Sequence, residues 1–312
     1  MTYAQYNLIE ATDYNNLTGG PSSTTANTLN VTWATGTGNA GYGQTALANV
    51  AIGDIVAAAA WANLVNTTSN VATHQGTSIT SVTAPVSGGS IAYVSAIPTN
   101  INTVYASRLN AQTVGSTTAS TATRATAWST ALTFTHTATF ANANAARYFF
   151  NAGGSLKMTC SAAAPGTAID TLWNQLCSNV GTVVLSSPTS GSITVASVSY
   201  NGVTKVGGGG STPTIGTNSG FYALTTANAN IFYQTASTGP ASYLGSFVNM
   251  FAKVDANSSP TVVTIYTVMD EVPDGYSVSS GTAVTMTAQA PETTNLSNAW
   301  GTISLASSVT GS

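Results

Sequence analysis

The side chains that most often carry out catalysis or bind metals are scarce in this chain and lie far apart. Its 312 residues include two histidines, His74 and His136, and two cysteines, Cys160 and Cys177. A structural zinc site needs about four closely spaced Cys and His ligands, and no such spacing occurs here. We therefore expect two free, buried thiols, with a disulfide formed after release of the protein as the alternative. His136 is expected to be a hydrogen-bonded core residue.

Only one group of carboxylates is dense enough to bind a metal. The segment "DEVPDG", residues 270–275, holds Asp270, Glu271 and Asp274, and Ca²⁺ prefers such oxygen ligands. A strand end followed by a Pro-Asp-Gly turn explains the same residues without an ion. We favour the turn, keep the three carboxylates as a weak metal candidate, and expect no cofactor.

Sequence patterns of common enzyme classes are also missing. No G-x-S-x-G nucleophile turn occurs, and "VGGGGSTPTIG" lacks the lysine of a phosphate-binding loop, which favours a hairpin loop. Glycoside hydrolysis needs two carboxylates across a cleft, and the nine Asp and Glu residues form no second cluster. The sequence predicts a protein that is not an enzyme.

The composition is poor in charge. Charged residues make up 5% of the chain and hydrophobic residues 43%, against a usual charged share of about 25%. Six cations stand singly, which argues against nucleic-acid binding because phosphate contacts draw on clustered cations. A surface of Thr, Ser, Asn, Ala and Gly does not repel copies of itself, so we expect self-association.

Export and membrane signals are absent as well. No run of about 18 apolar residues occurs, so no membrane insertion is expected. The start "MTYAQYNLIEATDYNN" lacks the basic and apolar regions of a secretory signal. A charge-poor, Thr/Ser/Asn-rich chain without an export signal is typical of a particle that is assembled in the host cytoplasm and freed by lysis. We therefore expect the protein in a virion.

Three regions follow from the pattern of residues. Residues 1–80 predict a mixed or helical attachment or assembly region, with a short helix ended by Gly19-Gly20 and a longer helix capped by Asp54 and carrying Trp61. Residues 81–125 predict a connector with one short helix in 100–111. Residues 126–312 predict the β region, with a division into 126–205 and 206–312 left open.

The β region alternates apolar and polar residues. "WSTALTFTHTATF" places Leu132, Phe134 and His136 on one face and threonines on the other, as in a half-buried strand. Similar short runs predict an antiparallel β-sandwich, jelly-roll or immunoglobulin-like. One inserted helix is expected in 167–179, with Trp173 on its apolar face.

The segment "AARYFFNAGGSLKMTC", residues 145–160, is predicted to be a strand with both faces covered. Arg147 and Phe149 would then lie on one face and Tyr148 and Phe150 on the other, with Arg147 stacked on a ring or paired with Asp170. Six residues are expected to anchor a core or an interface. They are Trp61, Arg147, Tyr148, Phe149, Phe150 and Trp173.

Two stretches resemble structural proteins of tailed bacteriophages. The first is "LNVTWATGTGNAGYGQ" with "VAAAAWANLVNTTSNVATHQGTSIT", and the second is "TFTHTATFANAN" with "ARYFFNAGG" and the helix that follows. The resemblance implies a structural subunit at the tail, neck or baseplate, which packs against copies of itself and other virion proteins. It carries over no functional residues.

Two other function classes stay open. One is a receptor-binding fibre or capsid decoration module that contacts host surface glycans, and the other is a cell-surface enzyme or adhesin outside any virus. The absence of a sustained repeat favours a compact subunit over a long rod.

Overall fold

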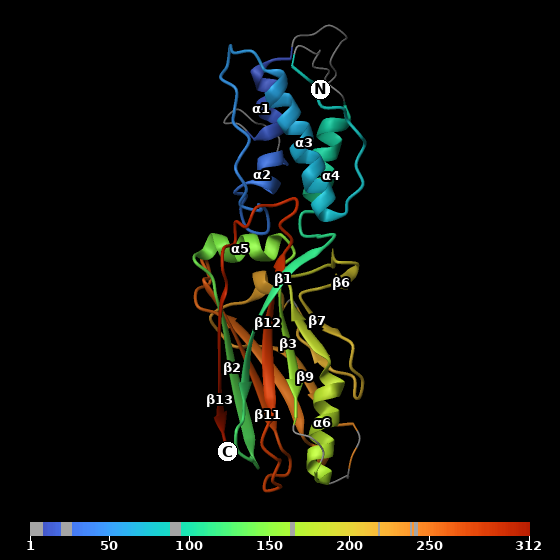
Figure 1. Ribbon diagram of the computed structural model, residues 1–312, viewed down its shortest axis with the longest axis vertical. Helices are drawn as coiled ribbons and strands as arrows, with labels where there is room; N and C mark the ends of the chain where they lie inside the picture. The colour runs from blue at the N-terminus through green and yellow to red at the C-terminus, as the bar shows by residue number, and fades with distance from the viewer. Residues whose placement is uncertain are drawn as a thin grey trace.

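The computed structural model shows an elongated chain with helices at one end and a β-sandwich at the other (Figure 1). It describes residues 9–19, 27–87, 95–162, 166–217, 219–237, 239 and 243–312. The last strand ends at the pole of the sandwich farthest from the helices, and the two parts meet in the middle of the molecule.

Four helices build the N-terminal part. They are α1 (Ala11–Thr18), α2 (Leu29–Trp33), α3 (Ala58–Gln75) and α4 (Ala96–Ala106). Gly19 ends α1 in the left-handed conformation, with φ 104°, as the C-cap pattern predicts. Trp61 on α3 is 1% exposed and lies 6.3 Å from Tyr14 of α1, so it is a core anchor.

Two helix boundaries differ from the expectation. Ala57, not Asp54, is the N-cap of α3, because Gly53 adopts a φ of +95° that keeps the chain in a turn. The expected helix in 100–111 begins earlier, at Ala96, and ends at Ala106. The buried Ile97 and Ile101 lie in its first two turns, and their packing fixes this earlier start.

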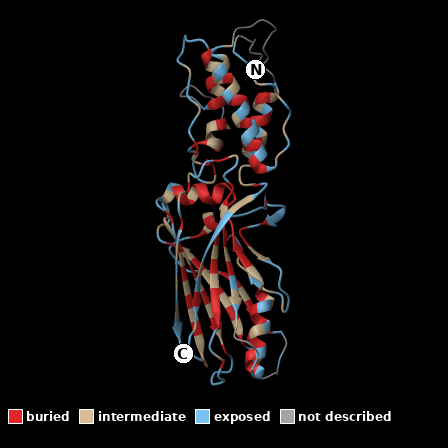
Figure 2. Cartoon of the chain, in the orientation of Figure 1, coloured by how far each residue is buried: buried red, intermediate tan, exposed pale blue. Residues whose placement is uncertain are grey.

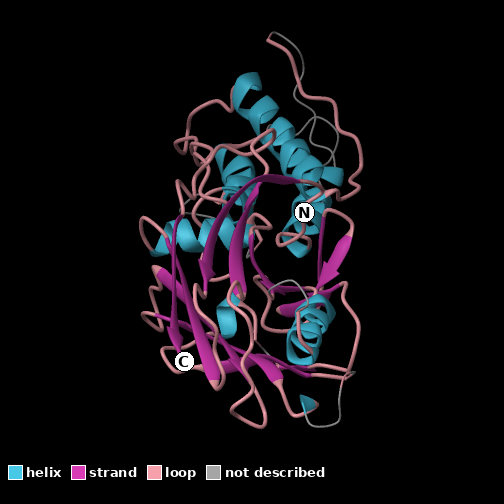
Figure 3. Ribbon diagram, turned by 60° about the horizontal axis from the view of Figure 1, so that its bottom comes forward, coloured by secondary structure: helices cyan, strands magenta, loops and turns pink. Residues whose placement is uncertain are grey.

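The sandwich consists of two antiparallel sheets (Figure 3). The five-stranded sheet has the order β1 (Val114–Thr123), β12 (Ala283–Pro291), β3 (Ser155–Ser161), β4 (Thr182–Leu185) and β7 (Val203–Val206). The six-stranded sheet has the order β13 (Ser304–Gly311), β2 (Ala131–Thr139), β11 (Val262–Asp270), β10 (Phe247–Val254), β9 (Ala229–Thr235) and β8 (Thr214–Ile215). A small hairpin joins β5 (Ile193–Val195) to β6 (Val198–Tyr200).

The prediction of a mainly antiparallel β-sandwich is confirmed. Leu132, Phe134 and His136 on β2 are all fully buried, and the threonines between them are half-buried. β10 and β11 alternate in the same way, and Figure 2 shows buried positions in red along the strands of the sandwich. Each sheet contains strands from both sides of residue 205, so the sheets do not follow that division of the chain.

Two segments take forms that the residue pattern does not show. Residues 114–123, inside the predicted connector, form β1 at the edge of the five-stranded sheet. "GFYALTT", expected as a strand, forms instead a short 3-10 helix η1 (Phe221–Ala223). The Phe221 ring stacks on Phe150 at 4.1 Å, and this packing holds the helical turn in place of a strand.

The strand expected over the first half of residues 145–160 is wrong. Residues 143–151 form helix α5 (Ala143–Asn151), which lies across the end of the sandwich (Figure 1). Asn142 begins the helix by accepting a hydrogen bond from the Ala145 N–H at 2.9 Å. Phe149 and Phe150 are therefore neighbours on one buried helix face and both pack on Phe140. The second half, Ser155–Ser161, is strand β3 as expected.

The inserted helix is confirmed as α6 (Ala168–Val180). Thr167 and Asp170 form a reciprocal capping box, and the Trp173 ring is fully buried at 4.9 Å from Trp128. Asp170 does not meet Arg147, because its carboxylate instead accepts hydrogen bonds from Ser279 N at 2.7 Å and Ser279 Oγ at 2.9 Å.

Candidate functional site

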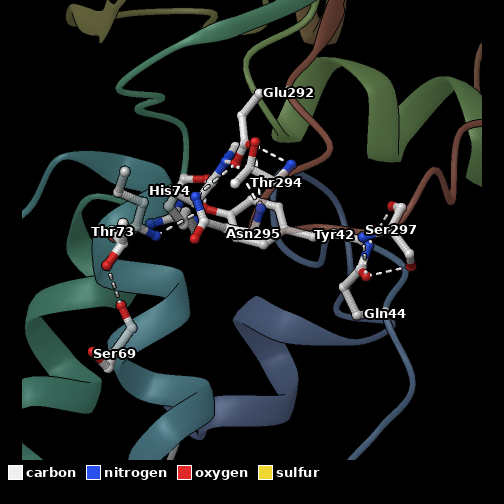
Figure 4. Close-up of polar contacts among 11 residues, drawn as sticks. Tyr42, Gln44, Ser69, Thr73, His74, Glu292, Thr294, Asn295 and Ser297 are labelled. Carbon is white, nitrogen blue, oxygen red and sulfur yellow. Dashed lines mark hydrogen bonds and ion pairs between the residues drawn. The ribbon is translucent and has the colours of Figure 1, made fainter.

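A buried polar cluster joins the helices to the sandwich (Figure 4). His74 Nδ1 at the end of α3 lies 2.9 Å from Glu292 Oε1, just after β12, and both side chains are nearly free of solvent. Glu292 also accepts the backbone N–H groups of Thr294 and Asn295 and the side-chain amide of Asn295. The hydrogen bond from His74 is the main cause that lowers the pKa of Glu292 to about 2, so this carboxylate is ionised.

Tyr42 and Gln44 extend this cluster. The Tyr42 ring packs edge-on against His74 at 5.2 Å, and its hydroxyl donates to the Arg108 carbonyl while accepting from Gln75 Nε2. Burial raises the pKa of Tyr42. Gln44 Oε1 accepts from both N and Oγ of Ser297, and Gln44 Nε2 donates to the Ser297 carbonyl. Residues 292–297 are thus tied to the helical part by the side chains of His74 and Gln44.

Arg147 makes the second connection between the two parts. From α5 its guanidinium donates to backbone carbonyls of the loop 35–40, at Thr35, Gly36, Gly38 and Ala40. Its carbon Cζ also lies 5.8 Å from the centre of the Tyr148 ring. Tyr148 in turn fills the space beside Gly43, where a Cβ would come within 2.3 Å of the ring. Arg147 is therefore an interface anchor between two parts of one chain.

The three carboxylates of residues 270–275 do not form a metal site. Among the described residues no group of three or more His, Cys, Asp or Glu side chains is placed to hold an ion. Glu271 Oε2 accepts the Tyr276 N–H at 3.2 Å, as in a turn that closes on itself. Burial and the nearby Asp274 charge raise the pKa of Asp270.

The remaining titratable candidates are structural. His136 Nε2 lies 3.0 Å from the Val284 carbonyl and so links the two sheets, and burial lowers its pKa. Cys160 and Cys177 are both free. Burial raises the pKa of Cys160 to about 12, so its thiol stays protonated and unreactive. The expectation for His136 is confirmed, and both thiols are free as expected, but only Cys177 is buried and Cys160 is half-buried.

A first apolar surface lies at the far end of the helical part. Ile52 is 76% exposed and Ile55 is 90% exposed. Both line a hollow of about 270 Å³ together with Ile9, and Glu10 and Asp54 stand at its edge. Since α3 starts three residues after Ile55 and ends at the junction, this loop lies about 27 Å from the sandwich along the helix axis.

A second surface of interest is the outer face of the six-stranded sheet, which mixes aromatic and polar side chains. Its outward side chains alternate with buried ones and are half-buried on β10 and β11. Four aromatic rings lie on this face. They are Tyr233, Phe247, Phe251 and Tyr266, and the first two are 5.2 Å apart.

Sequence reasoning found the core anchors but missed the junction. Trp61, Tyr148, Phe149, Phe150 and Trp173 are all buried as expected. The His74–Glu292 pair joins residues 218 positions apart, and neither residue lies in a motif. The one available signal is compositional: a chain with two histidines and nine acids has few polar groups to bury, so each buried one is significant.

Comparisons with other proteins give no relatives. The chain matches no protein-family model, and no curated protein or solved structure is significantly similar to it. Within the described ranges, none of the helices combines the length and apolar character that a bilayer span requires.

Proposed function

We propose that this chain is a non-catalytic structural subunit of a tailed-bacteriophage virion, at the tail, neck or baseplate. It acts by packing against copies of itself and against other virion proteins. The resemblance over residues 29–80 and 133–154 and the low charge of the chain support this role. The observation that carries it is the apolar surface around Ile52 and Ile55.

The apolar surface around Ile52 and Ile55 costs free energy as long as it is exposed to water and no partner covers it. Burying one isoleucine side chain is worth roughly 2 kcal/mol, and Ile52 and Ile55 leave most of their area in water. Adjacent exposed apolar residues of this size mark interaction sites. Among the described residues that line the hollow, the charged ones are Glu10 and Asp54, so a partner with apolar side chains and a flanking cation fits best.

The junction supports the same role mechanically. The surface at Ile52 and Ile55 lies at one end of the molecule and the sandwich at the other (Figure 1). The buried pair His74–Glu292 and the hydrogen bonds from Arg147 to the loop 35–40 hold these ends in one arrangement. A subunit of this kind fixes the position of two neighbours relative to each other.

Mass spectrometry and cross-linking of purified virions test the proposal. We expect the chain in intact particles, with cross-links from residues 51–57 to another virion protein. The double substitution Ile52→Ser and Ile55→Ser should leave the fold unchanged and remove the chain from particles. Val198→Ser, at a half-exposed valine on the β5–β6 hairpin, is the matched control and should be incorporated normally.

Two results would contradict the proposal. The first is a chain abundant in lysates and absent from particles. The second is normal incorporation of the Ile52 and Ile55 variant together with strong adsorption of the purified protein to host cells. That result favours the receptor-binding or decoration role instead.

A further inference from the structure

We propose that the outer face of the six-stranded sheet is a self-association surface, on which a second copy packs about a two-fold axis so that Lys253 of each copy meets Asp270 of the other. The inference rests on the proposed function, because it names the surface through which the subunit packs against copies of itself. It is independent of the apolar surface at Ile52 and Ile55.

The register of β10 and β11 arranges the outward side chains of this face in rows that cross both strands. Tyr266 on β11 stands beside Phe251 on β10, and in the next row Val268 stands beside Asn249. All four side chains are on the outward, half-buried side of the sheet. Large rings in one row therefore adjoin smaller side chains in the neighbouring row.

The charges of these strands lie at opposite ends. Asp270 pairs with Phe247 at one end of β10, and Lys253 pairs with Thr264 near the other end. Six residues separate Phe247 from Lys253 along β10, or about 20 Å at strand spacing. The two rows that hold Tyr266, Phe251, Val268 and Asn249 lie between them.

This pattern is self-complementary under a two-fold axis that runs between two stacked sheets, perpendicular to their strands. Such an axis reverses the strand direction of the second copy, so each Lys253 lies over the opposite Phe247, beside which Asp270 stands on β11 at about 4.8 Å, within reach of the lysine side chain. The same operation places Tyr266 over Val268 and Phe251 over Asn249, ring over smaller side chain in both cases. An isologous interface requires this reciprocity.

Neither charge has an ionic partner among the described residues, where the single ion pair is His74–Glu292. Lys253 Nζ lies 5.4 Å from the centre of the Tyr266 ring, and within the same residues no hydrogen bond to the Asp270 carboxylate is found. The carboxylate of Asp255, which is close to Lys253 in sequence, instead accepts hydrogen bonds from Thr261 and from the Val262 N–H at 2.9 Å. A second copy supplies the missing counter-charges for Lys253 and Asp270.

The size of the face predicts a concentration-dependent dimer. Five strands by eight residues measure about 20 Å by 25 Å, or ~500 Å² per copy. A total of ~1,000 Å² is at the low end of specific interfaces. Pairing in free solution should therefore be weak and become permanent when many copies are held together.

Sedimentation velocity of the full-length protein over a wide micromolar concentration range tests the inference. Lys253→Glu and Asp270→Lys should each raise the dimer dissociation constant at least about tenfold, since each replaces two attractions by two repulsions. The double variant reverses both charges and should restore wild-type affinity. Phe251→Thr, which keeps a strand-forming residue, should also weaken the dimer.

Lys157→Glu is the control. It makes the same change in net charge on the outer face of the other sheet, and it should leave the dissociation constant unchanged. A wild-type chain that stays monomeric throughout the range overturns the inference, as does a dimer insensitive to Lys253→Glu, Asp270→Lys and Phe251→Thr. Either outcome leaves the proposed function standing if the chain is found in particles. Absence from particles with an intact, charge-sensitive dimer fails the proposed function alone.

Discussion

Replacing Glu292 by glutamine should remove a pH-dependent part of the stability of this protein. The substitution keeps the shape of the side chain and removes the charge that His74 Nδ1 contacts at 2.9 Å. It also weakens the bonds that the carboxylate accepts from Thr294 and Asn295. Because these contacts tie residues 292–297 to α3, the loss acts on the connection between the helices and the sandwich.

The expected magnitude follows from the pKa of Glu292. A shift from the ordinary 4.5 to about 2 is ~2.5 pKa units, and one unit corresponds to about 1.4 kcal/mol, so the ionised carboxylate contributes on the order of 3 kcal/mol. The folded pKa is below the unfolded one, so the unfolded chain binds more protons between these values. This stability is complete above about pH 4.5 and is lost as the pH falls towards 2.

Urea unfolding followed by tryptophan fluorescence measures the effect at several pH values between neutral and strongly acidic. We expect the wild type to exceed Glu292→Gln by on the order of 3 kcal/mol at neutral pH, and the two curves to converge in acid. Other acids titrate in both proteins and cancel in the difference. Asp54→Asn, at an exposed carboxylate in a loop, is the control and should follow the wild type at every pH.

A constant difference between wild type and Glu292→Gln across this pH range would refute the reasoning. It would show that the carboxylate of Glu292 titrates alike in the folded and unfolded chains, and that any loss comes from shape alone.

Three further outcomes are expected from unfolding measurements. Arg147→Ala should cost roughly 2–3 kcal/mol of folding stability, because it leaves the carbonyls of the loop 35–40 without their charged donor. Arg147→Lys should recover only part of this loss. Equal stability of all three proteins would contradict the role of Arg147 at this loop. Gly36→Ala should be strongly destabilising, because the new Cβ would lie 2.4 Å from the Val31 carbonyl oxygen. The Cβ of Gly38→Ala meets nothing within 4 Å, so this variant should lose only about 1 kcal/mol for its left-handed φ. Similar losses at both glycines would count against this packing. Burial raises the pKa of Asp170, but hydrogen bonds from Ser279 and Thr167 lower it overall. Asp170→Asn should therefore cost about 1–2 kcal/mol of folding stability at neutral pH and less in strong acid. An unchanged denaturation midpoint would show that these bonds contribute nothing.

The alternating strands could be predicted from sequence because their pattern is local. In β2, Leu132, Phe134 and His136 face the core and the threonines between them face outward. This alternation repeats every two residues, so it can be seen within the strand itself. Helix α6 could be predicted in the same way, from the helical spacing of the apolar residues that include Trp173. In both cases the element's own sequence decides its form.

Helix α5 shows where this reasoning fails. Tyr148, Phe149 and Phe150 are aromatic residues that favour strands, yet Asn142 caps a helix and the Phe149 and Phe150 rings meet Phe140 and Phe221 from its buried face. The decisive partners lie elsewhere in the chain, so tertiary packing overrides local preference. The His74–Glu292 junction depends on how α3 packs on the end of β12, and the charge pattern of Lys253 and Asp270 depends on strand register, and no short segment contains that information.

The placement of the cations explains how so few of them suffice. Arg108 and Arg147 approach the same loop from two sides, Arg108 from the end of α4 to Asn39 and Arg147 from α5 to Gly36 and Gly38. The left-handed glycines of this loop leave its carbonyls without regular backbone partners. A guanidinium offers five donors in a fixed plane and can satisfy several carbonyls at once, which a lysine cannot. Arg147 thus holds this loop against the sandwich, and Arg108 holds the same loop against the end of α4.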